Sequence, residues 1–195
     1  MKKITYFAAA LLFCANLTSC DKEEIGGTAT ERMAGQWYVD IDAVDDSGNP
    51  IDGGEHYFGY DEERILLLTY NTSSNSEVQM WVDDLGAFDV ASYYGYGGYP
   101  NYAFKCLVDI DQNALTFSSS NAANHADVNK YKSDVYSITI ENGKILKGEG
   151  RQKNGSPADS IVFFVKYTND PWYPDDGYTK YKVSGIRYSG LAEND

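Results

Sequence analysis

The chain has 195 residues, with 16 Lys and Arg against 29 Asp and Glu, which gives a formal net charge of −13. This length suits one domain, and the shortage of positive charge argues against nucleic-acid binding and against strongly anionic ligands. Hydrophobic residues make up 43%, enough for a sizeable core. The 17 tyrosines, together with 18 glycines and only 5 prolines, favour strands over helices.

The N-terminus has the features of a secretion signal. Lys2 and Lys3 precede an apolar run that is too short to span a bilayer as a helix. The segment Leu17-Thr18-Ser19-Cys20 follows, and it resembles the lipobox of Gram-negative bacterial lipoproteins, whose cysteine becomes the lipidated first residue. We therefore expect residues 1–19 to be a signal peptide and Cys20 to be the lipidation site. An ordinary signal peptide with an incidental cysteine is the alternative.

Residues 20–33 contain few large apolar side chains, which predicts a flexible, lipid-anchored tether. Its start, Asp21-Lys22-Glu23-Glu24, resembles the acidic export tag of some surface lipoproteins. In other bacteria an Asp directly after the lipidated Cys means retention in the inner membrane. Because the acidic run continues, we expect a lipid anchor in the outer membrane and exposure at the cell surface. An inner-membrane or periplasm-facing location is the alternative.

From Gly35 onward the apolar residues recur with a period of two, which is typical of β-strands. Alternating runs occupy Trp37–Ala43, Val78–Val82, Tyr102–Ile110 and Tyr136–Ile140. The runs Ile65–Tyr70 and Ile161–Tyr167 are apolar on both faces, as in strands covered from both sides. Turn signals stand at Ser47–Pro50, Asn142-Gly143, Asn154-Gly155 and Asp176-Gly177.

These patterns predict an all-β fold with about eight to ten strands, and one short helical turn near Ala122–Asn129. Residues 34–195 are expected to form a single domain, an antiparallel barrel or sandwich. Cys106 shares an apolar strand face with Phe104 and Val108, which favours a buried, inert thiol over a nucleophile.

The segment Gly35-Gln36-Trp37 matches the Gly-x-Trp that opens the first strand of lipocalin-like (calycin) barrels. In those barrels an Arg from the last strand covers the Trp and closes one end, and Arg187 falls in phase with Tyr181 and Val183. With the lipobox, the length and the Ser-Gly-x-Arg-x-x-Gly close, the chain resembles a family of bacterial lipoproteins catalogued as lipid-binding putative hydrolases. The resemblance implies an antiparallel lipocalin-like β-barrel that is closed by Trp37 and Arg187.

The hydrolase half of that family label has no motif in the chain. A Gly-x-Ser-x-Gly nucleophile elbow is missing from the sequence, and the only histidines, His56 and His125, have polar surroundings typical of the surface. We therefore expect no catalytic residues, although residues distant in sequence can converge in space.

Metal binding is not indicated either. The run that begins at Asp109 resembles a calcium loop, but Ala114 stands where the sharp turn requires Gly, and Ser120 where the bidentate Glu is required. The acidic stretch Asp40–Glu55 is more typical of a solvated loop than of a calcium site. We expect no metal and no cofactor.

The segment Tyr93–Tyr102 holds five tyrosines and three glycines. Tyrosine rings can stack on sugars or cover a lipid tail, so we expect Tyr94, Tyr96 and Tyr99 to contact a ligand at the end of the barrel opposite Trp37. Trp172 is expected to frame the same opening. The alternative is a loop whose rings pack on the barrel rim, with a rigid connector around Trp172.

The expected function is non-catalytic binding of a small apolar or amphipathic, neutral or zwitterionic ligand at the cell envelope. The expected partners are a lipid-like ligand and, through the anchor, a membrane, without nucleic acid; the sequence leaves the oligomeric state open. Two alternatives stand: a lipid-related hydrolase, and a glycan-binding accessory surface lipoprotein that uses its tyrosines for stacking.

Overall fold

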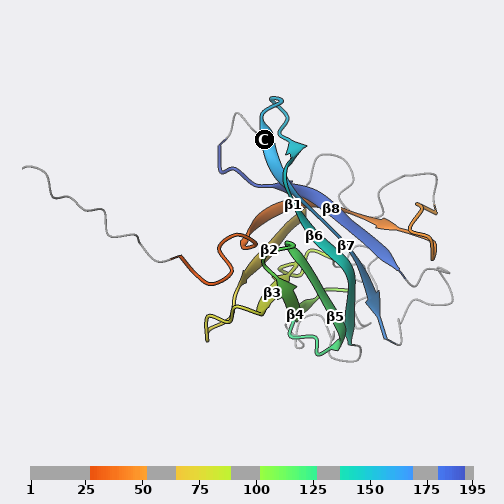
Figure 1. Ribbon diagram of the computed structural model, residues 1–195. Helices are drawn as coiled ribbons and strands as arrows, with labels where there is room; N and C mark the ends of the chain where they lie inside the picture. Colours follow the sequence, from red (N-terminus) through yellow and green to blue (C-terminus); the bar gives the residue numbers. More distant parts are fainter. Residues whose placement is uncertain (1–26, 52–64, 89–101, 127–136, 169–179, 192–195) are drawn as a thin grey trace, which may run out of the picture.

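The computed structural model describes residues 27–51, 65–88, 102–126, 137–168 and 180–191. These residues form a closed antiparallel barrel in which each strand pairs with its neighbour in the chain and β8 pairs with β1 (Figure 1). The strands are β1 Gly35–Ala43, β2 Ile65–Asn71, β3 Gln79–Asp83, β4 Lys105–Asp111, β5 Thr116–Ala122, β6 Ile138–Arg151, β7 Pro157–Tyr167 and β8 Tyr181–Arg187.

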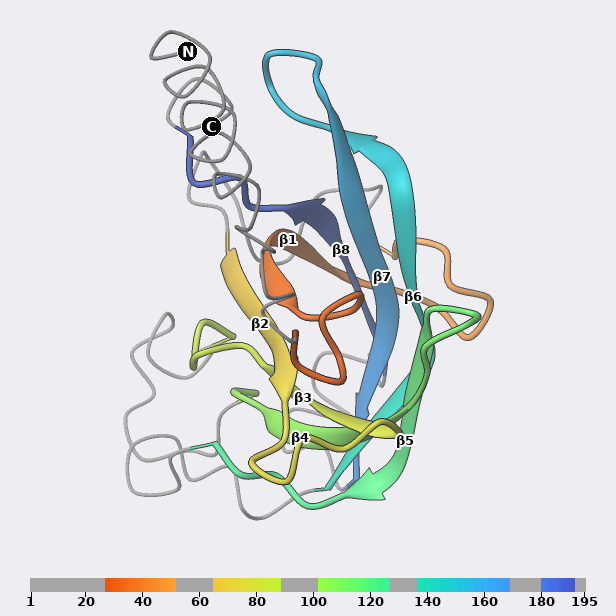
Figure 2. The same cartoon turned by 60° about the vertical axis from the view of Figure 1, so that its left-hand side comes forward.

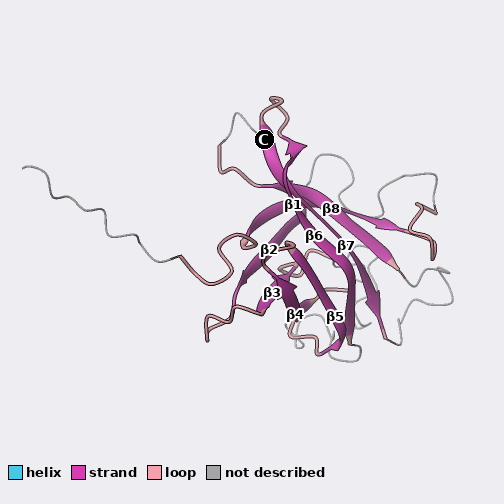
Figure 3. Ribbon diagram, viewed as in Figure 1, coloured by secondary structure: helices cyan, strands magenta, loops and turns pink. Residues whose placement is uncertain are grey.

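The prediction of an all-β, lipocalin-like antiparallel barrel is confirmed, with eight strands. The described ranges contain no helix (Figure 3), and the part of the expected helical turn that falls within them, residues 122–126, is the end of β5 and a loop. Within these ranges, too, no helix is long and apolar enough to cross a membrane.

Side chains from all eight strands fill the interior of the barrel. In β1 the inward residues Trp37, Val39 and Ile41 are 0–1% exposed and alternate with half-buried outward residues, as a pleated strand requires. The other inward residues are Leu67, Met80, Val82, Cys106, Val108, Phe117, Ile138, Ile140, Ile145, Ile161, Phe163, Val165, Tyr181 and Val183. An eight-stranded barrel is just wide enough for such side chains to fill.

The two ends of the barrel differ in their connections. At one end, which we call the turn end, residues 72–78, 112–115 and 152–156 join the strands by short turns. At the other, the loop end, the connections are the longer segments 44–64, 84–104, 123–137 and 168–180. The β6–β7 hairpin extends beyond the other strands at the turn end (Figures 1 and 2). The longer connections between the strands therefore all belong to the loop end.

The expected turn at Asn142-Gly143 is wrong, because β6 continues through it. Asn142 adopts a φ of 55°, and the register with β7 shifts between Glu141 and Lys144, which defines a β-bulge. A Cβ on Gly143 would lie 2.5 Å from the ring of Phe117 in β5. Only glycine therefore allows β5 and β6 to approach each other this closely. The Asn-Gly pair thus bends a strand instead of ending it.

Residues 28–34, most of which the sequence assigned to the tether, form a hydrogen-bonded turn on the turn end of the barrel. The N–H groups of Met33 and Ala34 both donate to the Thr30 carbonyl at 2.8 Å. The side chains of Thr30 and Met33 are fully buried. The packed part of the chain therefore begins several residues before β1.

Candidate functional site

The turn end is sealed around Trp37. Its indole Nε1 donates to Thr69 Oγ1 at 2.9 Å, and that hydroxyl donates in turn to the Met33 carbonyl at 2.7 Å. Both side chains are buried, and Met33 packs in the same core cluster. The N-terminal turn thus covers the indole and is joined to it through the Thr69 hydroxyl.

Arg187 adds a second layer to this seal. Its Cζ lies 4.3 Å from the centre of the Trp37 ring, within the range of a cation–π contact. The same guanidinium donates to the Ala34 carbonyl at 2.7 Å and to Asp159 Oδ2 at 3.1 Å. One side chain thus joins β8 to β1, to the N-terminal turn and to β7.

The surroundings of Asp159 favour the charged form of its carboxylate, which pairs with Arg187. Burial acts to raise its pKa, but the hydrogen bond from Lys147, the N–H of Gly148 and the positive charges of Lys147 and Arg187 lower the pKa overall. The Lys147 ammonium lies 2.8 Å from Asp159. The group is therefore ionised at neutral pH and pairs with Arg187.

The loop end holds a cluster of four aromatic rings, which we call the ring cluster: Phe88, Tyr102, Tyr167 and Tyr181. Phe88 stacks on Tyr102 with centroids 5.0 Å apart and meets Tyr181 edge-on at 5.3 Å. Tyr102 contacts Tyr167 at 4.8 Å and Tyr181 at 5.2 Å. All four are at most 6% exposed. They close the apolar interior at the end where the longer connections lie.

All three phenol groups of the ring cluster are hydrogen-bonded within it. The Tyr167 hydroxyl donates to the Tyr102 carbonyl at 2.7 Å, and the hydroxyls of Tyr102 and Tyr181 lie 3.1 Å apart. A buried phenol normally requires such a partner. The ring cluster is therefore amphipathic, with apolar faces and a small group of hydroxyls inside.

A buried acid, Asp84, organises the backbone next to the ring cluster. It is 1% exposed, and its carboxylate accepts the N–H groups of Gly86 at 2.8 Å, Phe88 at 3.1 Å and Phe104 at 3.1 Å. Burial raises its pKa to about 7, although these three N–H bonds act in the opposite direction. Asp84 thus attaches the turn that carries Phe88 to Phe104, the residue directly before β4.

Several residues named from the sequence lie outside the described residues. They are Cys20, His56, Tyr94, Tyr96, Tyr99 and Trp172. Phe88, which precedes the segment Tyr93–Tyr102, and Tyr102, its last residue, both belong to the ring cluster. Sequence reasoning did not select Phe88 or Asp84; the signal was the local pattern Asp84-Leu85-Gly86-Ala87-Phe88, which is typical of an Asx-turn.

Among the residue types that often supply a nucleophile or a general base, the described residues include one cysteine, Cys106, and one histidine, His125. Burial raises the pKa of the Cys106 thiol to about 12, so it stays protonated at neutral pH. His125 is exposed; its ring meets Trp81 edge-on at 5.2 Å, and its backbone N–H donates to the Lys105 carbonyl. In the part of the chain that the structure describes, no group of three or more His, Cys, Asp or Glu side chains is placed to hold a metal ion.

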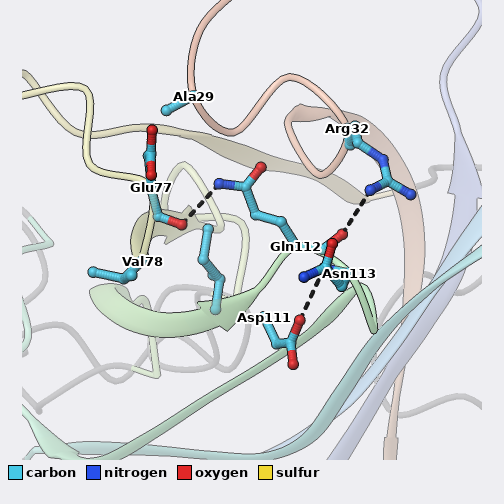
Figure 4. A pocket seen from close by; sticks show the side chains of 8 residues that line it. Ala29, Arg32, Glu77, Val78, Asp111, Gln112 and Asn113 are labelled. Atoms are coloured by element: carbon cyan, nitrogen blue, oxygen red, sulfur yellow. Dashed lines mark hydrogen bonds between the residues drawn. The ribbon is translucent and has the colours of Figure 1, made fainter.

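A groove of about 640 Å³ lies on the outside of the turn end (Figure 4). Arg32 donates to the Gln112 carbonyl at 3.0 Å, and the Gln112 amide donates to the Glu77 carbonyl at 2.7 Å, so three of the turns that line the groove are joined. Asp111 accepts the N–H groups of Asn113 and Ala114, as in a tight turn. The groove is open and largely polar, unlike an apolar ligand pocket.

A known protein family matches most of the chain. The model of a family described as "Lipid-binding putative hydrolase" matches residues 22–192, almost the whole chain. No curated protein matches the chain.

Proposed function

The chain belongs to this family of lipid-binding putative hydrolases, and from that premise we propose that it binds a small apolar or amphipathic molecule at the loop end of its barrel. The proposed role is non-catalytic. The observation that carries it is the ring cluster, because apolar faces beside buried hydroxyls suit a ligand with an apolar chain and a neutral polar group.

The difference between the two ends supports this location. Trp37, Arg187 and the N-terminal turn seal the turn end with hydrogen-bonded contacts. The ring cluster stands where four longer connections leave the barrel, and binding residues concentrate on such connections. A ligand that approaches the loop end therefore meets the aromatic side chains of the ring cluster first.

The charge of the protein narrows the ligand class. The chain carries a formal net charge of −13, which repels anions over most of its surface. The buried carboxyl of Asp84 next to the ring cluster adds to this effect when it is ionised. A neutral or zwitterionic ligand is therefore favoured over a fatty-acid carboxylate or a polyanion.

The proposal includes a place in the cell. Residues 1–19 act as a signal peptide, Cys20 carries the lipid, and the anchored barrel faces outward from the outer membrane. Residues 28–34 pack on the turn end, so the tether leaves from that end. In this arrangement the turn end faces the membrane and the loop end faces away from it, which leaves the ring cluster accessible to ligand.

Mass spectrometry of co-purifying molecules tests the proposal. A Cys20→Ala chain is expressed in a bacterial envelope, purified without detergent, and extracted with chloroform and methanol; this substitution removes the acyl chains proposed at Cys20. We expect a neutral or zwitterionic lipid in near-equimolar amount. An extract free of lipid would contradict the proposal. Turnover of a long-chain p-nitrophenyl ester would favour the hydrolase alternative, and a bound oligosaccharide the glycan-binding one.

A further inference from the structure

The four members of the ring cluster are not held in the same way. Tyr167 is the last residue of β7 and Tyr181 the first of β8, so the barrel itself fixes both. Tyr102 is tied to them through its carbonyl and its hydroxyl. Phe88 comes from a connection, and its side chain has no hydrogen-bonding atom. Removal of the Phe88 ring therefore leaves the hydrogen bonds among the three tyrosines intact.

The turn that carries Phe88 is a compact unit with its own internal bonds. Asp84 accepts the N–H groups of Gly86 and Phe88, and its carbonyl accepts that of Ala87 at 2.9 Å. The unit is attached at its base, where Asp84 and Phe104 exchange two hydrogen bonds. A rotation about this base would move Phe88 without breaking the bonds inside the turn.

The conformation of the turn also favours such a movement. Leu85 adopts a φ of 54° and Gly86 a φ of 77°, and the left-handed region is unfavourable for a leucine. The Leu85 side chain is 51% exposed, so it contributes little packing to compensate. This backbone strain lowers the cost of rearranging the turn.

The space occupied by the Phe88 ring has the character of a ligand site. It is bounded by the face of Tyr102, the edge of Tyr181 and, at 6.3 Å, the ring of Tyr167. The hydroxyl pair of Tyr102 and Tyr181 lies within the same group of rings. An alkyl chain or a single aromatic ring would fit this space, with a neutral polar group directed to the hydroxyls.

We propose that Phe88 is the gate of the ligand site: the Asp84–Phe88 turn swings outward, and an apolar group of the ligand takes the place of the Phe88 ring among Tyr102, Tyr167 and Tyr181. This inference rests on the proposed function and adds a named residue, a movement and a ligand class to it. The ring blocks the site in the empty protein, so ligand binding competes with the packing of Phe88.

The test is a fluorescence titration with N-phenyl-1-naphthylamine, a neutral aromatic probe whose emission rises in apolar sites. The full chain carrying Cys20→Ala serves as the reference, and Phe88→Ala is made in it. Because a gate that is mostly closed reduces apparent affinity by the open fraction, we expect the Kd to fall about tenfold in Phe88→Ala, with faster association in stopped-flow. Thermal melting checks that the variant is folded, and Phe88→Leu replaces it if it is not.

Phe163→Ala is the matched control. Phe163 is also fully buried, but its ring packs against those of Phe104 and Phe117 inside the barrel and does not belong to the ring cluster. The Kd of Phe163→Ala for the probe is expected to stay within about twofold of the reference, because loss of the Phe163 ring does not open the loop end. An equal gain in both variants, or no gain in Phe88→Ala, would overturn the gate.

The titration also separates the gate from the proposed function. If the reference chain binds the probe and Phe88→Ala has the same Kd, the gate is wrong while lipid binding stands. If neither the reference chain nor any variant binds the probe, both are wrong.

Discussion

Arg187 lies directly over Trp37, with its guanidinium carbon 4.3 Å from the centre of the indole, and the two residues are cross-strand partners of β8 and β1. This pair joins the last strand to the first at the position where the barrel closes. The same guanidinium holds the carbonyl of Ala34, so the closure of the barrel and the cover of its turn end depend on one side chain.

Trp37 is a large, fully buried side chain, so we expect it to contribute strongly to the stability of the turn end. Trp37→Ala is expected to lower the free energy of unfolding by about 3–5 kcal/mol, through lost burial and the cavity left behind. Urea denaturation followed by circular dichroism measures this change. A loss below about 1 kcal/mol would show that the N-terminal turn collapses into the space and that the indole is dispensable.

Arg187→Lys tests the two hydrogen bonds that the guanidinium donates, to the Ala34 carbonyl and to Asp159. A lysine ammonium cannot bond Ala34 and Asp159 while it stays flat on the Trp37 ring, so we expect a loss of about 1–3 kcal/mol in the free energy of unfolding. Arg151→Lys is the matched control, because Arg151 is exposed and donates only to carbonyls of its own hairpin. Equal effects of the two substitutions in the same denaturation experiment would contradict this role for Arg187.

Asp84 should make stability depend on pH in an unusual direction. Its pKa is raised from 3.8 to about 7 in the folded protein, so the folded state keeps a proton that the unfolded state releases between these values. The contribution to stability is fully present below about pH 4 and is lost as the pH rises to about 7, by up to about 4 kcal/mol. Asp84→Asn cannot ionise, so the difference in unfolding free energy between wild type and variant should change across this pH window. A constant difference from pH 4 to 8 would contradict the raised pKa.

The regular strands could be predicted because their signal is local. The alternation around Trp37 and Val39 follows from the pleat of a half-buried strand, and the structure has β1 there. β5 gave no comparable signal, since Thr116–Ala122 is rich in Ser and Asn and buries only Phe117 below 9% exposure. Its place in the sheet comes from backbone pairing with β4 and β6, which composition does not report.

The ring cluster could not be predicted because its members are distant in sequence. Tyr102 and Tyr181 meet through the closure of the barrel, and no period or spacing connects them. The Asn142-Gly143 pair shows the opposite case, in which a strong local turn signal is overridden because strand pairing on both sides of it continues. The Asn-Gly pair predicts a local bend of the backbone. Whether the chain also reverses direction depends on the strand pairing around it.

The proposed anchor predicts a clean separation of location from folding. Cys20→Ala should release the protein from the membrane fraction into the soluble fraction while its melting temperature stays unchanged, because Cys20 precedes the described residues that pack on the barrel. Cell fractionation with immunoblotting measures the first effect, with Cys106→Ala as a control that keeps the anchor. Retention of Cys20→Ala on membranes after a salt wash would contradict the lipoprotein proposal.

The tyrosine segment is expected to act on the ligand and not on the fold. Replacement of Tyr94, Tyr96 and Tyr99 together by Ser should raise the Kd for N-phenyl-1-naphthylamine at least about tenfold, because each ring is expected to contribute contact area to the ligand. The melting temperature should shift by less than about 2 °C, because we expect these rings to contact the ligand and not the core. A large loss of stability with unchanged binding would instead assign these rings to the packing of the rim.

The central claim is that the loop end of the barrel binds a neutral or zwitterionic lipid-like molecule. The most direct measurement is an NMR titration of the ¹⁵N-labelled Cys20→Ala chain with a lysophosphatidylcholine below its micelle concentration. The account predicts saturable shifts of the amides of Phe88, Phe104 and Tyr181, with those of Trp37 and Arg187 unchanged. Shifts centred on Trp37 and Arg187, or shifts that never saturate and spread over the whole chain, would contradict it.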